Sequence, residues 1–304
     1  MKILFCGSGW RPIVDFIEAR IPAQHQFVRW DLQTPLAQLV SDVEVLLPSN
    51  ARVDAAVLAA APALRLIQQP AVGTDSIDLA TARARGIPVC NSPGVNHIAV
   101  AELALLLILA LARRLPAAQR AFRDRVLGGV LGHQLAGRVL GIIGPGRSGQ
   151  ALAERAAALG LGVRTLGRGA TDEERRAFFG ACDIISVHCP LNEQTRGLID
   201  AAALAAMKPG VHLINVARGP VLDRAAVLAA LRAGKLGGLG VDVHWDHPWN
   251  PEDELYRDDR VLALPHLGGS TEEAAANITE ILLENLGRLK RGEPLLHRVD
   301  VPGT

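Results

Sequence analysis

Residues 139–149 read VLGIIGPGRSG, an apolar run that passes directly into three glycines spaced G-x-G-x-x-G. The apolar run predicts a strand, and the Ala- and Leu-rich residues 150–159 predict a helix. Gly144 suits the tight turn, Gly146 allows close approach to a pyrophosphate, and Gly149 permits close helix–strand packing. A strand–loop–helix of this kind points the helix N-terminus at the phosphates of a bound dinucleotide. The loop residues predicted to bind it are Gly144, Pro145, Gly146, Arg147, Ser148 and Gly149.

The strand predicted next, residues 162–166, ends at Gly167 and Arg168. NAD-binding proteins usually carry a carboxylate at this point, where it binds the ribose 2′-hydroxyl. Gly167 brings no charge that would repel a 2′-phosphate, and the Arg168 guanidinium can pair with one. We therefore expect NADPH to be preferred, with NADH still possible. The alternative is that Arg168 is a solvated loop residue and that both cofactors are used.

Short apolar runs alternate with helix-like stretches on both sides of the glycine loop, which predicts parallel sheets with helices on both faces. The predicted strands are 2–6, 43–48, 64–68, 139–143, 162–166, 184–189, 212–216, 238–243 and 261–263. The pattern restarts near residue 138, after a helix predicted for 98–114 and a less regular stretch at 115–137. A helix predicted for 271–291 can return to the first half. The fold class is therefore α/β, with two doubly wound parallel-sheet domains.

The composition fits a folded globular protein with a neutral surface. The 304 residues are 49% hydrophobic and 21% charged, with a formal net charge of +1, which argues against a nucleic-acid or membrane-surface protein. The most apolar segment, 98–112, contains Glu102 and is shorter than the ~20 residues needed to cross a bilayer. The four cysteines form no C-x-x-C pair, so we expect free thiols and a cytoplasmic location.

Further motifs resemble one family, the D-isomer-specific 2-hydroxyacid dehydrogenases, and within it the NADPH-type glyoxylate/hydroxypyruvate reductases. The matching segments are AVGTDSID at 71–78, GIPVCN at 86–91, VAE at 100–102, HCPL at 188–191 with Thr195, NVARG at 215–219, GVDV at 240–243 and PHLGG at 265–269. The resemblance covers residues 64–271, and the first 60 or so match only in pattern.

The resemblance implies a Rossmann cofactor domain inserted in a flavodoxin-like substrate domain. We accordingly expect a substrate domain of residues 1–96 and 274–304 and a dinucleotide-binding domain of residues 97–273. It also implies a homodimer through the cofactor domain and hydride transfer to C2 of a small 2-oxo acid, giving a D-2-hydroxy acid. The substrate contacts it implies are Ala71, Val72, Gly73 and Arg218, and the further cofactor contacts are His188, Pro190, Thr195, Val216, Ala217, Asp242 and Gly268.

Two side chains also make chemical sense without the resemblance. Arg218 offers a planar fork of donors to a carboxylate, and it follows an apolar run at the carboxyl end of a predicted strand, where ligands bind. His266 suits proton delivery to the substrate oxygen, since the pKa of histidine lies near working pH. The alternatives are a surface arginine and a structural histidine.

The sequence departs from the family pattern at His247. The family places there a glutamate that pairs with the catalytic histidine, orients it and raises its pKa. A neutral imidazole at His247 can still orient His266, but it cannot stabilise an imidazolium, and two close imidazoles oppose double protonation. Asp246 can supply the carboxylate only through a register change, since neighbouring side chains on an extended chain point opposite ways.

Three functions remain open at this point. The first is a 2-oxo-acid reductase whose catalytic residues are Arg218, His266 and His247 or Asp246. The second is a reductase of a 2-imino acid, whose nitrogen can be protonated before hydride attack, giving a D-amino acid. The third is a catalytically weak protein that senses a dinucleotide. A metal cluster of His244, Asp246 and His247 is a further possibility, but a nucleotide site explains these residues more simply, so we expect no metal.

Overall fold

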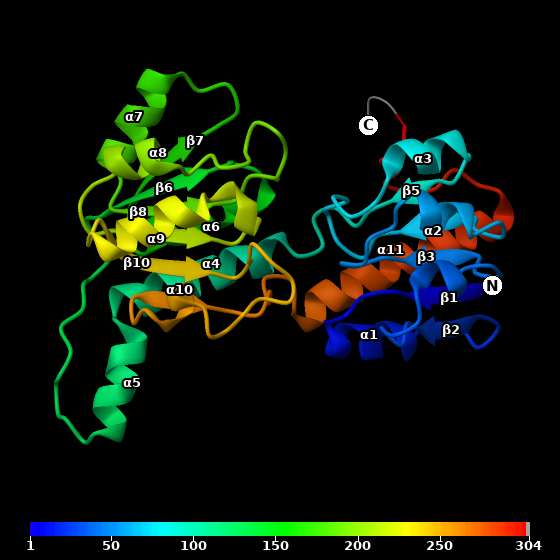
Figure 1. Ribbon diagram of the computed structural model, residues 1–304, viewed down its shortest axis with the longest axis horizontal. Helices are drawn as coiled ribbons and strands as arrows, with labels where there is room; N and C mark the ends of the chain where they lie inside the picture. Colours follow the sequence, from blue (N-terminus) through cyan, green and yellow to red (C-terminus); the bar gives the residue numbers. More distant parts are fainter. Residues whose placement is uncertain (302–304) are drawn as a thin grey trace. The chain divides into compact units, whose positions relative to one another are not determined.

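The computed structural model describes residues 1–301 and divides into two compact units. Unit 1 comprises residues 1–96 and 270–301, and unit 2 comprises residues 97–269. Each unit is built on one parallel sheet with helices packed against it (Figure 1). This confirms the prediction of two doubly wound α/β domains.

Unit 1 has five parallel strands in the order β2-β1-β3-β4-β5, which is the flavodoxin-like order. Its strands are β1 (Lys2–Phe5), β2 (Gln26–Arg29), β3 (Val45–Leu47), β4 (Leu66–Gln68) and β5 (Val89–Cys90), and its helices are α1 (Arg11–Glu18), η1 (Leu36–Gln38), α2 (Ala55–Ala59), α3 (Leu79–Ala84) and α11 (Glu272–Arg291). The sequence pattern predicted β1, β3 and β4. It missed β2 and β5, the two edge strands, because one is half-exposed and the other has two residues.

Successive residues of β1 face opposite sides of the sheet, so each side has its own apolar core. Ile3 and Phe5 pack in one cluster, which also takes in Ile278 and Leu282 of α11. Leu4 packs in the other cluster, beneath α2 and α3. The last helix of the chain therefore completes a core that the first strand begins.

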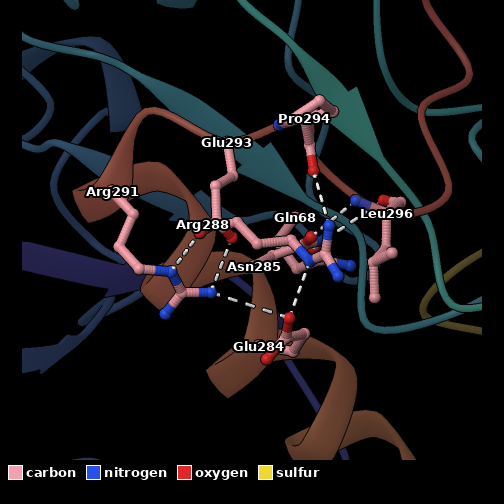
Figure 2. A network of polar contacts seen from close by, with 8 residues as sticks. All are labelled: Gln68, Glu284, Asn285, Arg288, Arg291, Glu293, Pro294 and Leu296. Carbon is pink, nitrogen blue, oxygen red and sulfur yellow. Dashed lines mark hydrogen bonds and ion pairs between the residues drawn. The ribbon is translucent and has the colours of Figure 1, made fainter.

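A buried polar network fixes α11 and the segment after it within unit 1 (Figure 2). Asn285 donates from Nδ2 to Gln68 Oε1 at 2.7 Å, and its Oδ1 accepts from the N–H of Leu296 at 2.8 Å. On the outer side Arg288 pairs with Glu284. The predicted domain boundary at 273/274 falls inside α11, which begins at Glu272, and the compact unit instead begins at Ser270 with the whole helix.

We expect Asn285→Ala to destabilise the protein, because Gln68 Oε1 and the Leu296 N–H then lack their buried partner. Each unsatisfied buried group costs about 1–3 kcal/mol of unfolding free energy. Urea unfolding measures the effect. Arg291→Ala is the matched control, since its exposed ion pair with Glu293 is worth about 0–1 kcal/mol. Equal losses in the two variants would contradict the assignment.

Unit 2 has six parallel strands in the order β11-β10-β9-β8-β6-β7. Its strands are β6 (Val139–Ile143), β7 (Gly162–Leu166), β8 (Ile184–Val187), β9 (Val211–Asn215), β10 (Leu236–Val241) and β11 (Val261–Ala263), and its helices are α4 (His97–Ala112), α5 (Leu115–Arg123), α6 (Arg147–Ala158), α7 (Asp172–Ala181), α8 (Ala201–Ala206), η2 (Gly219–Val221), α9 (Arg224–Arg232) and α10 (Glu254–Arg257). The chain passes from β6 to β7 on one side and then to β8 on the other. Ligands of such sheets bind at this switch point, beyond the carboxyl ends of the strands.

The expectation of irregular structure at 115–137 was wrong for its first part. Residues 115–123 form α5, which carries Pro116 in its first turn, where proline is well tolerated. All four cysteines are buried and free. Within residues 1–301, no helix combines the length and the apolar character needed to cross a bilayer.

Candidate active site

The glycine loop joins β6 to α6 as predicted, and its three glycines serve different needs. Gly144 has φ +85°, and a Cβ there would lie 2.7 Å from the backbone N of Cys189. A Cβ on Gly149 would lie 2.6 Å from the carbonyl oxygen of Gly144. A Cβ on Gly146 would meet nothing within 4 Å, and this residue caps α6 without a side-chain hydrogen bond. The fold itself therefore requires Gly144 and Gly149, whereas Gly146 leaves open space beside the first helical N–H groups, which fits a diphosphate.

His188 links β8 to this loop. Its Nε2 lies 2.9 Å from Ser186 Oγ, and its Nδ1 lies 3.1 Å from Ser148 Oγ. Burial lowers the pKa of His188 to about 4, so the ring is neutral at pH 7. Both ring nitrogens are used inside the protein, so His188 supports Ser148 and the phosphate loop.

Three exposed arginines lie on the glycine loop's helix and on or just after β7. Arg147 begins α6, Arg164 lies on β7, and Arg168 follows Gly167 at the end of that strand. Within residues 1–301, none of the three takes part in a hydrogen bond or an ion pair. A Cβ on Gly167 would meet nothing within 4 Å, so neither packing nor backbone conformation demands glycine there. The end of β7 therefore carries exposed guanidinium groups, and the acidic first turn of α7, with Asp172, Glu173 and Glu174, follows it in the chain.

The loop after β8 is closed by Thr195. Its Oγ1 donates to the carbonyl oxygen of Pro190 at 2.6 Å and accepts from the N–H of Asn192 at 2.8 Å. Pro190 is exposed at the start of this loop. The hydroxyl of Thr195 thus shapes the loop that the sequence resemblance assigned to the cofactor.

Arg218 stands just beyond the carboxyl end of β9. The buried side chain of Asn215 shapes the turn, since its Nδ2 donates to Arg218 O at 2.8 Å and its Oδ1 accepts from Ala217 N at 3.0 Å. The next residue, Gly219, must be a glycine, because a Cβ there would lie 2.2 Å from the backbone of His244. The half-buried Arg218 side chain donates from Nη1 to Ala217 O at 2.8 Å. Val216 and Ala217 are buried, so cofactor contacts at these two positions fall to the backbone.

His266 follows β11 in a left-handed backbone conformation, with φ +59°. This region is uncommon for residues other than glycine and is often found at functional sites. Asp242 holds the turn, since its two carboxylate oxygens accept from Leu267 N at 2.6 Å and Gly268 N at 2.7 Å. Burial raises the pKa of Asp242 to about 6. Asp242 therefore anchors the loop that presents His266.

His247 lies opposite His266, with the two ring centres 6.0 Å apart and the planes tilted by 50°. Burial lowers the pKa of His266 to about 4, with further lowering from Arg218, His247 and His244. The pKa of His247 is lowered by burial and by Arg218, while Asp246 acts in the opposite direction. Asp246 thus raises the pKa of His247 and has no such effect on His266. With its pKa near 4, the His266 ring is neutral at pH 7.

His244 is a structural residue of the same loop. Its Nε2 lies 2.9 Å from the carbonyl oxygen of Leu264, which can only accept, so Nε2 carries the proton. Its Nδ1 then accepts from the hydroxyl of Tyr256 at 2.8 Å, and the ring of Trp249 lies 4.5 Å away between centres. In the part of the chain that the structure describes, no group of three or more side chains could hold a metal ion.

The predicted substrate loop of unit 1 has its carbonyl groups turned into the protein. Ala71 O accepts from Ser92 N at 3.1 Å, Val72 O from Asn91 Nδ2 at 2.8 Å, and Gly73 O from Gln69 Nε2 at 2.7 Å. The N–H groups of residues 71–73 donate to no other residue within 1–301. Such a loop has three backbone donors available for an anion.

Several supporting residues were missed by sequence reasoning. Gln69 belongs to no motif that was singled out, and Asn215 was named only as the first residue of the 215–219 segment, with no role assigned, although each is a buried amide at the end of an apolar strand. Tyr256 and Trp249 carried a signal, because aromatic residues make up only 4% of the chain. Two of its four tryptophans and its one tyrosine fall within residues 245–256.

Comparison with known proteins agrees with this geometry. Residues 105–268 match the family described as D-isomer specific 2-hydroxyacid dehydrogenase, NAD binding domain. The glyoxylate reductase of Thermococcus litoralis is 37% identical over 278 residues, which cover 85% of this chain and 84% of that protein. The D-3-phosphoglycerate dehydrogenase of Archaeoglobus fulgidus is 35% identical over 270 residues. These cover 85% of this chain but only 51% of that protein, so the chain spans about half its length.

Among solved structures, the TT0316 protein from Thermus thermophilus superimposes with a TM-score of 0.88 at 33% identity. The match covers 98% of this chain and 100% of that one. The chain therefore belongs to the D-isomer specific 2-hydroxyacid dehydrogenase family, and residues 105–268 form its binding domain for a nicotinamide dinucleotide.

Proposed function

We propose that the protein is an NADPH-preferring reductase that converts a small 2-oxo acid into a D-2-hydroxy acid. The observation that carries this proposal is the placement of Arg218 and His266 beyond the carboxyl ends of β9 and β11, in the sheet that bears the glycine loop.

The chemistry assigns one task to each group. The bound reduced nicotinamide supplies the hydride that C2 receives. Arg218 holds the substrate carboxylate through charge-assisted hydrogen bonds. His266 delivers a proton to the oxygen on C2. The phosphate loop, supported by His188 through Ser148, holds the diphosphate of the cofactor.

The proposed preference for NADPH is supported by the open space at Gly167 and by the exposed guanidinium of Arg168. The double variant Gly167→Asp with Arg168→Ala introduces a carboxylate at position 167. It also removes the guanidinium that would pair with the 2′-phosphate of NADPH. We expect the ratio of kcat/KM for NADPH to that for NADH to fall roughly 10- to 100-fold, since one charged hydrogen bond is worth about 1.5–3 kcal/mol. Steady-state kinetics with both cofactors measures it, with Arg175→Ala, on α7, as the control. An unchanged ratio would refute the preference.

A second candidate substrate is a 2-imino acid, which would yield a D-amino acid. It is favoured by one observation: the low pKa of His266, which faces an imidazole where the family has a carboxylate. An iminium nitrogen already carries its proton when hydride arrives, so it needs no acid from the enzyme.

One screen tests both candidates. Oxidation of NADPH is followed with a panel of 2-oxo acids, with and without ammonia, and with imines generated by an amino-acid oxidase. Turnover of 2-oxo acids without ammonia supports the proposed reaction, and turnover only with imines selects the second candidate. Tight NADPH binding without any turnover would favour a protein that senses the dinucleotide.

We also propose that the protein is a homodimer through unit 2. The support is an apolar surface on α5 and the segment after it, which stand away from the sheet in Figure 1. Phe122 is 85% exposed and Leu131 87%, and Leu127 is fully exposed. Exposed apolar groups in this number mark an interaction surface, and α4 carries two further exposed leucines, Leu106 and Leu109. A second copy of the chain is the partner we assign to it.

Leu127→Glu is expected to shift the protein from dimer to monomer, because a carboxylate would be buried without a partner in the interface. Sedimentation velocity over a range of concentrations measures the change. Leu159→Glu, an exposed leucine after α6, is the matched control and should leave the mass unchanged. A wild-type protein that sediments as a monomer would end this proposal.

A cytoplasmic location is part of the proposal. Its support is the set of four cysteine thiols, all free, in a protein that has no disulfide within residues 1–301.

A further inference from the structure

His247 and His266 differ in their access to solvent. His247 is exposed, whereas His266 is half-buried beside it, with 6.0 Å between the ring centres. One water molecule hydrogen-bonded to both rings would be enough to bridge a separation of this size. The two imidazoles thus form a short path from solvent to the group that serves the substrate.

The charges around this pair favour a single proton on it. Arg218, His247 and His244 all lower the pKa of His266, and Arg218 also lowers the pKa of His247. Of the two histidines, only His247, the outer member, has its pKa raised by Asp246. The Asp242 carboxylate is engaged by the N–H groups of Leu267 and Gly268. A proton is therefore received more easily at His247 than at His266, and protonating one ring opposes protonation of the other.

We propose that His247 relays the proton of the reaction between solvent and His266. The proposal rests on the proposed function, because it concerns the proton which that reaction consumes. When hydride bonds to C2, the carbonyl π pair moves onto oxygen, and the protonated His266 ring gives its proton to that oxygen and becomes neutral. His247 takes a proton from an acid of the buffer and passes it to His266. One proton is consumed per substrate reduced, and the reverse path releases one during oxidation.

Chemical rescue separates a relay from a residue that only orients His266. His247→Ala should lower kcat for 2-oxo acids roughly 10- to 100-fold, since positioned proton transfer contributes on this scale or above it. KM should change little. Added imidazole should restore kcat in a saturable way, and a series of substituted imidazoles should rescue according to their pKa. The solvent deuterium isotope effect on kcat should rise in the variant and fall again on rescue.

A second measurement needs no turnover. The exchange of the His266 ring N–H with water, followed by ¹⁵N-edited NMR saturation transfer on the protein without cofactor, should slow in His247→Ala and recover with imidazole. His297→Asn, which removes another exposed imidazole at a left-handed position, is the control for both measurements.

The outcomes separate the relay from the proposed function. Rescue of kcat together with recovery of exchange supports the relay. An unchanged kcat in His247→Ala, or a loss that imidazole does not restore, overturns it. If the wild-type protein reduces no 2-oxo acid, the proposed function fails and the exchange measurement alone decides whether His247 carries protons to His266.

Discussion

Arg218→Ala is expected to lower kcat/KM for 2-oxo acids roughly 10²–10⁴-fold, because two charged hydrogen bonds worth about 1.5–3 kcal/mol each are lost. The guanidinium is presented by a rigid turn, fixed by Asn215 and closed against the backbone of His244 at Gly219. The side chain is half-buried. The loss should appear mainly with substrates that carry a carboxylate, and the affinity for NADPH should not change.

Two variants control this experiment. Arg218→Lys keeps the charge but not the planar fork, so it should recover only part of the activity. Arg232→Ala removes an arginine of the same unit that pairs with Glu254 on the surface, and it should leave kcat/KM unchanged. Because Arg218 also lowers the pKa of His266, the protonation midpoint of that ring should rise in Arg218→Ala, as NMR titration would show. Normal kinetics in Arg218→Ala would remove this residue from the substrate site.

His266→Asn is expected to lower kcat by about 10²–10⁴-fold, the usual contribution of a positioned acid or base. Asparagine is the appropriate replacement because it tolerates the left-handed backbone that His266 adopts at φ +59°. The fold and the binding of NADPH should therefore survive, which isothermal titration of the cofactor can verify. A variant that keeps the wild-type kcat would show that the proton comes from elsewhere.

The same residue sets a pH dependence for the wild-type protein. With the pKa of His266 lowered to about 4, kcat/KM for reduction should fall as pH rises from 4 to 7, roughly tenfold per unit. Oxidation of the 2-hydroxy acid uses the neutral ring as a base, so its kcat/KM should stay flat over most of this range. Opposite pH profiles for the two directions are the expected result, and parallel profiles would contradict it.

The lowered pKa also affects stability. Between pH 4 and 6.5 the unfolded chain binds a proton at this histidine that the native protein excludes, so stability is lost as pH falls through that window. His188 and His212, whose pKa values burial also lowers to about 4, add to the same loss. Urea unfolding at pH 7 and at pH 4.5 should show a smaller difference for His266→Asn than for the wild-type protein.

The strongest sequence patterns predicted the parts of the fold that depend on local chemistry. Strands β6, β7 and β11 were predicted to the residue; β6 and β11 are apolar runs ended by a clear change of composition, whereas β7 is the mixed segment GVRTL that follows the predicted helix. The glycine loop was predicted because its spacing carries a steric reason at Gly144 and Gly149. Edge strands β2 and β5 were missed, since half-exposed or two-residue strands leave no periodic pattern.

The candidate site was predictable in its principal residues and not in the residues that support them. Arg218, His266 and His247 stand in recognisable segments, and their roles remain predictions until tested. The side-chain amide of Gln69 donates to the carbonyl oxygen of Gly73, and that of Asn215 donates to the carbonyl oxygen of Arg218. No local sequence pattern predicts such side-chain to backbone hydrogen bonds. His244 looked like a possible metal ligand in the sequence, and only the tertiary contacts with Tyr256 and Leu264 reveal its structural task.

The return of α11 to the first sheet has a consequence for biosynthesis. Strands β1 to β5 leave the ribosome first, but the helix that covers Ile3 and Phe5 follows only after the whole of unit 2 has been made. Unit 2 is continuous in the chain and can fold as soon as it emerges, whereas unit 1 must wait with one apolar sheet face open. Nascent chains that end before residue 272 should therefore bind cellular chaperones through their N-terminal segment, and release should follow once Asn285 reaches Gln68.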